Sequence, residues 1–193
     1  MTAQNQTQIT KSTVNGVNGV NVDRVMSLIG GIEVDNKRSK FQFRLNNRWL
    51  DGGLNRSHIK DYFADGREYD TRNKPFIVDA DEPAVSGGGD SAPNPMEYVL
   101  HSLASCLTST LINHAAVQGI EIKSVESSLT GDMDVRGMLG LSGEVRKGYK
   151  HVKVHMLVDS TENAATLKEL ALFSPVHDII SRSLPVDFVL ETC

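Results

Sequence analysis

Cysteine is the residue type in this sequence with the most reactive side chain. The chain contains two cysteines, Cys106 and Cys193, and no Cys-x-x-Cys pair. A thiolate is a strong nucleophile, whereas a thiol in apolar surroundings behaves as a small hydrophobic group. Cys106 is therefore either a reactive thiol or a packing residue. We expect Cys193, the last residue, to be mobile, exposed and incidental.

Other motif-like patterns lack the residues that their chemistry requires. Residues 132–143 imitate a calcium loop, but Arg136 and Gly143 stand where oxygen ligands are needed. His151 and His155 share one face of a predicted strand, about 13 Å apart, which is too far for one metal ion. The glycines at 87–89 lack the Gly-Lys-Ser/Thr ending of a phosphate loop. The sequence thus predicts neither a metal nor a cofactor.

Composition and charge restrict the class of partner. The 193 residues carry a formal net charge of −4 without a basic stripe, and phosphate backbones need clustered Lys and Arg. Two distant cysteines do not make a secreted disulfide scaffold. No segment has the apolar length of a membrane span or a signal peptide. We expect a cytoplasmic protein that binds neither nucleic acid nor membrane.

The hydrophobic pattern predicts that Cys106 lies inside a long helix. Apolar residues recur at intervals of three and four from Met96 to Ile112, and Gly119 ends the run. Asn94 suits the N-cap position and Pro95 suits the first helical position. In the middle of such a helix, Cys106 lacks the N-terminal dipole that lowers the pKa of many reactive thiols.

Strand patterns precede and follow this helix. Alternation begins at Phe41, turn signals stand at 51–53 and 65–66, and residues 75–79 form another extended piece. After the helix, the pattern predicts extended segments at 120–135 and 149–158, helices at 161–172 and from Ser174-Pro175, and a strand at 186–190. This order has no βαβ repetition. It predicts an α+β fold with a mixed or antiparallel sheet and helices on one side.

The N-terminal region differs from this domain. Residues 1–21 are polar and predict a flexible arm. Residues 22–29 could form two helical turns, which Gly30 and Gly31 would end. We therefore divide the chain into an arm at 1–21, a short helix and linker at 22–39, and a main domain at 40–193.

The residues around Cys106 resemble a known family. Segment 93–112, PNPMEYVLHSLASCLTSTLI, is similar to the helix that bears the peroxidatic cysteine in the osmotically inducible protein C (OsmC) and organic hydroperoxide resistance family. Further matches follow the family's order at 49–53, 81–95, 131–141 and 173–176. The resemblance implies an OsmC-like fold, in which mixed or antiparallel sheets wrap around long central helices. It also implies an intertwined homodimer with the thiols at the subunit interface.

The resemblance implies a reaction and candidate residues for it. In the family's peroxidases, a cysteine thiolate is oxidised to sulfenic acid and a second cysteine, in a Cys-Pro sequence, resolves it. Cys106 matches the first cysteine, but Ser174 occupies the position of the second. An arginine and a glutamate activate the family's thiol. The candidates here are Arg56, otherwise an exposed turn cation, and Glu97, one residue later than the family's glutamate and otherwise a first-turn helix acid.

Two functions follow from these residues. The first is a one-cysteine enzyme of oxidative-stress defence that reduces a small organic hydroperoxide and is regenerated by an external thiol reductant. The second is a non-catalytic protein of the same fold that binds a small apolar ligand or a partner, with Cys106 as packing. Retention of Cys106 favours the first function, and loss of the Cys-Pro thiol favours the second.

Overall fold

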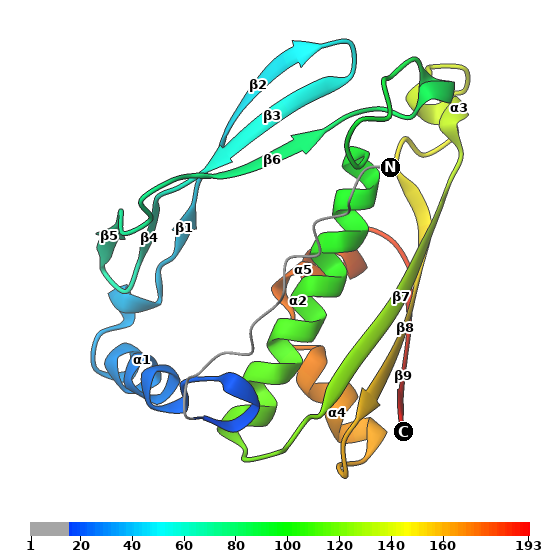
Figure 1. Ribbon diagram of the computed structural model, residues 1–193. Coiled ribbons are helices and arrows are strands. Elements are labelled where there is room, and N and C mark those ends of the chain that lie inside the picture. Colours follow the sequence, from blue (N-terminus) through cyan, green and yellow to red (C-terminus); the bar gives the residue numbers. More distant parts are fainter. Residues whose placement is uncertain (1–15) are drawn as a thin grey trace, which may run out of the picture.

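The computed structural model describes residues 16–193. Within this range the chain forms five α-helices and three sheets of three strands each (Figure 1). The first sheet has the strand order β1-β4-β5, the second β2-β3-β6 and the third β7-β8-β9. The predicted α+β class is confirmed. Residues 1–15 of the predicted arm lie outside the described residues.

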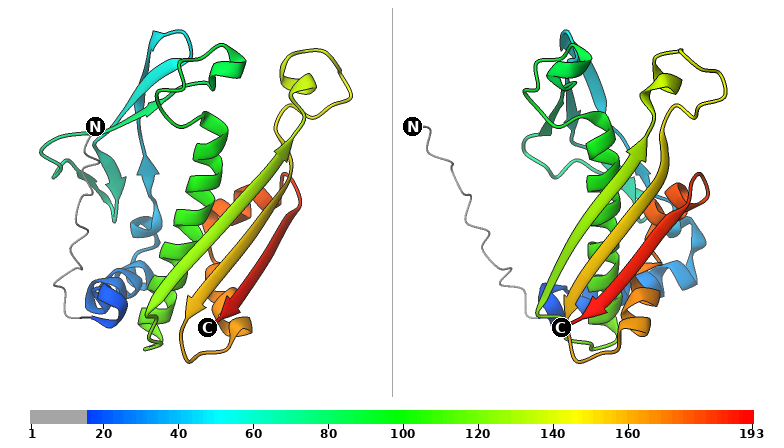
Figure 2. Two further views of the ribbon diagram at one scale, coloured as in Figure 1. Left: turned by 45° about the vertical axis from the view of Figure 1, so that its right-hand side comes forward. Right: turned by 90° about the vertical axis from the view of Figure 1, so that its right-hand side faces the viewer.

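Helix α2, Pro95–Val117, occupies the centre of the fold (Figures 1 and 2). It begins where the sequence predicts, because the Asn94 side chain accepts a hydrogen bond from the Met96 amide at 2.8 Å and Pro95 takes the first helical position. Gly119 follows the helix with φ +72°, a conformation that glycine adopts without strain. The predicted central helix is confirmed.

The third sheet pairs strands in both directions. Strand β7, Ser124–Met133, runs antiparallel to β8, Tyr149–Asp159, whereas β9, Val186–Thr192, runs parallel to β8. Helices α2, α4 (Ala164–Ala171) and α5 (Pro175–Ser181) cover one face of this sheet (Figure 2). This is the predicted mixed sheet with helices on one side. The short helix α3, Val135–Met138, lies in the β7–β8 connection and shortens the extended segment predicted at 120–135.

The main core lies between α2 and the third sheet. Strand β8 alternates as predicted, so that every second side chain is buried against the helices. The fully buried large side chains of this core are Leu103, Leu107, Leu111, Val152, Val154, Met156, Val158 and Leu167. Tyr149 joins the sheet to the start of α2, because its hydroxyl donates to the Met96 carbonyl at 2.8 Å. Its ring lies against Gly131, where a β-carbon would come within 2.6 Å.

The N-terminal strands form two small antiparallel sheets. The first consists of β1 (Gln42–Phe43), β4 (Tyr62–Ala64) and β5 (Arg67–Tyr69); the second consists of β2 (Asn46–Asp51), β3 (Leu54–Ile59) and β6 (Phe76–Ala80). The expected strands are present, but the expectation of a simple meander is wrong, because β4 pairs with β1 and β6 with β3 in two separate sheets. The second sheet packs mainly within itself and leaves several large apolar side chains exposed, namely Phe43 and Leu45 beside it and Trp49, Phe76 and Ile77 within it.

Helix α1, Val22–Val34, continues through both glycines that the sequence predicts as its end. The prediction that the two glycines end α1 is wrong, because another side chain fills the space beside Gly31. The Arg38 guanidinium, from the short 3₁₀ helix Asn36–Ser39, occupies it, and a β-carbon on Gly31 would lie 2.2 Å from Arg38 Nη1. A helical glycine costs about 1 kcal/mol relative to alanine, and tertiary packing offsets this cost here.

The described end of the predicted arm contacts the main domain. Asn18 Nδ2 donates to the Ile120 carbonyl at 2.9 Å, and the Ile122 amide donates to Asn18 Oδ1 at 2.8 Å. Residues 16–21 are thus attached to the segment that links α2 to β7. Among residues 16–193, none of the helices has the length and apolar content needed to cross a bilayer.

The core between α2 and β8 predicts the effect of truncating Leu107, whose side chain is fully buried. We expect Leu107→Ala to lower the free energy of unfolding by about 2 to 5 kcal/mol, because it removes buried methyl groups and leaves a cavity. The matched control is Leu141→Ala, since Leu141 is 72% exposed. The control should change stability by less than about 0.5 kcal/mol. Urea denaturation followed by circular dichroism measures both, and equal losses would contradict this core.

Candidate functional site

Cys106 lies on α2 at the boundary between its buried and exposed faces. Leu103 and Leu107 on one side are fully buried, whereas Ser105 and Ser109 on the other are exposed. The thiol is half-buried, and its nearest polar contact is the Thr110 hydroxyl, 4.0 Å from Sγ. Within residues 16–193 it forms no disulfide. The sulfur is thus accessible from the serine-rich side of the helix.

Glu97 closes the N-terminus of α2. Its Oε2 accepts a hydrogen bond from the Asn94 amide at 2.8 Å, while Asn94 caps the helix in return. This reciprocal arrangement is a capping box. The carboxylate therefore has a structural role in the single chain. Glu97 and Cys106 are nine positions apart on the helix, about 13 Å along its axis.

Arg56 lies on β3 directly opposite Asp79 on β6. Its Nε and Nη2 donate to the two Asp79 carboxylate oxygens at 2.7 and 2.8 Å, and this holds the pKa of Asp79 below its usual range. The Tyr98 hydroxyl of α2 donates to the Asp79 carbonyl at 2.6 Å. Arg56 is thereby a sheet residue fixed near the start of α2, rather than a free turn cation.

The three predicted site residues do not meet within one chain. Glu97 lies at the start of α2, and Tyr98 links Arg56 to the same end of the helix. Tyr98 precedes Cys106 by eight residues, about 12 Å along the axis. Among the described residues, no ion pair or hydrogen bond connects Cys106 to a charged side chain. Within the described chain, Arg56 bonds to Asp79 and Glu97 to the Asn94 amide, and neither bonds to Cys106.

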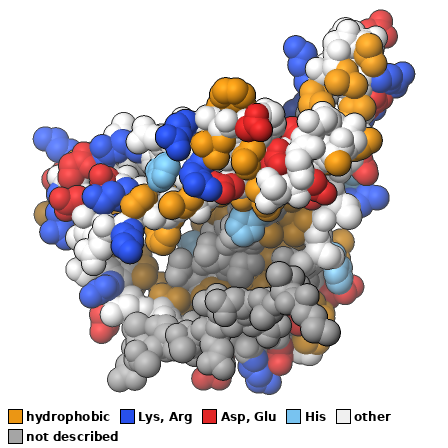
Figure 3. Space-filling model, turned by 45° about the horizontal axis from the view of Figure 1, so that its top comes forward, with side chains coloured by type: hydrophobic (Ala, Val, Ile, Leu, Met, Phe, Trp, Pro, Cys, Tyr) orange, Lys and Arg blue, Asp and Glu red, His pale blue; other side chains and the backbone are white. Residues whose placement is uncertain are grey.

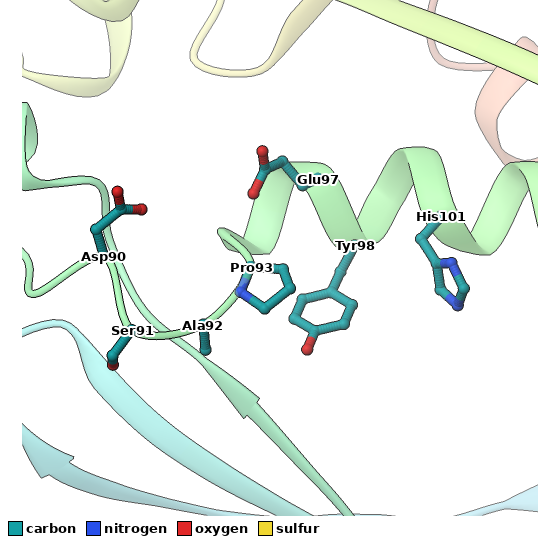
Figure 4. A pocket seen from close by; sticks show the side chains of 7 residues that line it. All are labelled: Asp90, Ser91, Ala92, Pro93, Glu97, Tyr98 and His101. Atoms are coloured by element: carbon teal, nitrogen blue, oxygen red, sulfur yellow. The ribbon is translucent and has the colours of Figure 1, made fainter. Parts of the chain in front are cut away.

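A pocket of about 510 Å³ opens at the N-terminus of α2 (Figure 4). Glu97, Tyr98 and His101 project from the helix, and residues 90–93 of the preceding loop form the other wall. Cys106 does not line it. Tyr98 and His101 are not among the residues predicted from the sequence, although Glu97 and His101 stand four residues apart on one exposed stripe of the helix. That spacing is the signal that would have found His101.

The loop before α2 is held by a buried carboxylate that the sequence analysis also missed. Asp81 is 2% exposed. It accepts hydrogen bonds from the Ser91 hydroxyl at 2.8 Å, the Ser91 amide at 3.1 Å and the Glu82 amide at 2.8 Å. The two bonds from Ser91 are the main reason why the pKa of Asp81 is lowered. Asp81 thereby fixes one wall of the pocket.

Ser174 and Cys193 have positions that follow from local structure. Ser174 is buried and caps α5 as predicted, since its Oγ accepts from the His177 amide at 3.2 Å. Cys193 is exposed beyond β9, and its amide donates to the Val158 carbonyl at 3.1 Å. Among residues 16–193, no group of three or more His, Cys, Asp or Glu side chains is placed to hold a metal ion.

The fold and the site define an α+β protein with a half-buried cysteine on its central helix. Comparisons with known proteins identify the family of proteins that it resembles. Residues 87–189 match the family model described as OsmC-like protein. An OsmC-like protein from Mycoplasma pneumoniae has a similar structure, with TM-score 0.57 and 14% identity over 78% of this chain and 96% of that one. An organic hydroperoxide resistance protein OsmC from Legionella pneumophila gives TM-score 0.51 and 19% identity over 78% and 95%.

The family match covers more than half of the sequence, and the chain belongs to the OsmC-like family. At these identities the structural neighbours establish the fold alone. The expected family and fold are both confirmed. A comparison with curated proteins found no match.

The hydrogen bonds of Asp81 predict a pH-dependent stability. Because its pKa in the folded state is lowered, Asp81 stabilises the fold above its unfolded pKa of about 3.9, and this contribution is lost as the pH falls through the folded pKa. We expect Asp81→Asn to reduce stability at pH 7 and to match the wild type in strong acid. Urea midpoints across this pH range measure the difference.

The control for this prediction is Asp90→Asn in the same loop. Asp90 is exposed and has φ +51°, a conformation that asparagine also tolerates. Its substitution should leave the urea midpoint unchanged at pH 7. A stability loss in Asp81→Asn that persists undiminished in strong acid would contradict the role of the ionised carboxylate.

Proposed function

We propose that the protein is a thiol-dependent hydroperoxide reductase of the one-cysteine type, acting in oxidative-stress defence through Cys106. The observation that carries the proposal is the position of the thiol. It lies half-buried on the central helix, inside the region that matches the OsmC-like family, with its sulfur reachable from a serine-lined face. The substrate class, an organic hydroperoxide, is proposed from the similarity to an organic hydroperoxide resistance protein, because the apolar helix residues beside the thiol are buried in the core.

The proposed reaction has two stages. The Cys106 thiolate attacks the distal oxygen of the hydroperoxide, the O–O bond breaks, and the alkoxide takes up a proton to leave as the alcohol. Cys106 is then a sulfenic acid. One external thiol condenses with it, which releases water and forms a mixed disulfide. A second external thiol attacks that disulfide, which regenerates Cys106 and releases the oxidised reductant.

A homodimer is part of this proposal. The second sheet exposes Trp49, Phe76 and Ile77, and the serine-rich side of α2 beside Cys106 is uncovered. Apolar side chains of this size are normally covered in a stable protein. We propose that a second copy covers both surfaces and brings its Arg56, and with it Glu97, toward the first copy's thiol. Arg56 would favour the thiolate by charge.

The alternative function is a binding protein of the same fold, in which Cys106 only packs. Two observations favour it: Ser174 stands at the position of the resolving thiol, and within residues 16–193 no charged side chain forms a hydrogen bond with Cys106. Reactivity of the thiol separates the two functions.

The first test is oxidation of Cys106 by one equivalent of cumene hydroperoxide. We expect a sulfenate that dimedone traps at Cys106, and conversion to sulfinate in excess oxidant, because position 174 has no thiol to intercept it. Peptide mass spectrometry identifies the modified residue. Cys193→Ser should react like the wild type and Cys106→Ser should not react. A Cys106–Cys193 disulfide would replace the one-cysteine scheme, and an unmodified Cys106 would favour the binding protein.

The second test asks whether Arg56 acts across the dimer. Arg56→Gln should lower the rate of Cys106 oxidation about tenfold, since one pKa unit of thiolate stabilisation corresponds to that factor. Mixing Arg56→Gln chains with Cys106→Ser chains should restore about a quarter of the wild-type rate, because half of the dimers are mixed and each has one complete site. Light scattering confirms that dimers are present.

Arg48→Gln is the matched control, because Arg48 is exposed and lies on β2 directly opposite Arg56 on β3. It should oxidise at the wild-type rate. A stable monomer would contradict the dimer. A mixture no faster than its separate components would contradict action of Arg56 from the partner subunit.

A further inference from the structure

A second pocket, of about 540 Å³, lies between helix α1 and the first sheet. Figure 1 shows both elements on the side of the molecule remote from the third sheet. The pocket belongs to residues 24–69, which precede the family match at 87–189. Its volume is in the range of small-molecule sites. Among the described residues, its lining contains three arginines, Arg24, Arg38 and Arg67, and one carboxylate, Asp65.

Arg38 and Asp65 form the frame of this pocket. Asp65 has φ +50° and precedes Gly66 with φ +76°, so the two residues make the tight Asp-Gly turn of the β4–β5 hairpin. From this turn Asp65 Oδ1 accepts a hydrogen bond from Arg38 Nε at 2.5 Å. The opposite side of the Arg38 guanidinium fills the space left by Gly31. The glycine in α1 thereby allows helix and hairpin to be joined.

Arg67 is held by aromatic side chains. Its guanidinium lies over the Tyr69 ring, with Cζ 4.6 Å from the centroid. Tyr69 in turn stacks on Tyr62, its cross-strand partner, with centroids 5.0 Å apart and planes within 6°. Such stacking orients a guanidinium, and a hydrogen bond to the Tyr69 side chain is the main reason why the pKa of Arg67 is raised.

The pocket has an excess of positive charge. Arg38 is paired with Asp65, whereas Arg24 and Arg67 form no ion pair with a carboxylate among residues 16–193. The surrounding half of the chain is also basic: 12 of the 20 Lys and Arg residues lie within residues 1–79, against 9 of the 24 acidic ones. Figure 3 shows Lys and Arg side chains gathered on the side of the molecule where the N-terminal sheets lie. The field there attracts anions.

Part of the wall between the arginines is apolar. Leu28 of α1, Phe41 and the buried Ala64 supply this surface, together with the edges of the two tyrosine rings. The Asp65 carboxylate also lines the pocket but is paired with Arg38, so Arg24 and Arg67 dominate the charge that a ligand meets. A planar carboxylate matches the fork of donors on a guanidinium.

We infer that this pocket binds a small aromatic carboxylate. The carboxylate is held between Arg24 and Arg67, and the ring lies against Leu28 and Phe41. This site is separate from Cys106 and independent of the reaction proposed there.

Titration of the full chain with 4-fluorobenzoate, followed by ¹⁹F NMR, tests the inference. We expect saturable binding with one site per chain, weakened about fivefold by Arg24→Gln and by Arg67→Gln, as for one ion pair at a solvent-exposed site. Arg24 has no carboxylate partner among the described residues, so Arg24→Gln should retain the wild-type circular dichroism spectrum. The matched control Arg48→Gln removes the same charge from the second sheet and should bind like the wild type.

Two further probes separate the parts of the ligand. Neutral 4-fluorobenzyl alcohol keeps the ring without the carboxylate, and inorganic phosphate keeps an anion without the ring. Both should bind more weakly than 4-fluorobenzoate. Absence of saturable binding, equal binding of the alcohol, or equal weakening by Arg48→Gln would overturn the site. Stronger binding of phosphate would overturn the assignment of the ligand class.

Discussion

The burial of one face of α2 against β8 is the interaction on which the rest of the structure depends. Leu103, Leu107 and Leu111 form a single stripe that is completely removed from solvent, and the inward residues of β8 meet it. Because these side chains fix the rotation of the helix about its axis, Cys106 is fixed at the edge of the buried face. Its intermediate exposure is a consequence of core packing, and its one side-chain hydrogen-bond contact in the described part of the chain is the neutral Thr110 hydroxyl.

The start of α2 is held as firmly as its buried face. Asn94 and Glu97 satisfy the first amides of the helix, Asp81 anchors the preceding loop, and Tyr98 connects the helix to the Arg56–Asp79 pair on the second sheet. The polar side chains that could activate the thiol of a peroxidase are engaged in these contacts. The polar network and the cysteine are about two helical turns apart within one chain. A complete site therefore depends on the proposed dimer.

The N-terminal part of the chain is held together by different interactions from those of the main core. The first and second sheets are small and leave large apolar side chains exposed. Backbone pairing holds each sheet, and arginine contacts add to it: Arg38 with Asp65, Arg56 with Asp79, and Arg67 with the Tyr69–Tyr62 stack. Exposed ion pairs of this kind contribute little to stability individually. They orient guanidinium groups, which is why this region presents both a proposed activating arginine and a proposed anion site.

The sequence by itself determined the elements whose signals are local. The three-and-four spacing of α2, the caps at Asn94 and Ser174, the alternation of β8 and the Asp-Gly turns all depend on neighbours within a few residues. Only the tertiary structure decided what depends on distant neighbours. Helix α1 continues through Gly31 because Arg38 packs there, Arg56 is paired because Asp79 lies across the strand, and Asp81 is buried because Ser91 folds back onto it. In each case the deciding contact joins residues that no local pattern links.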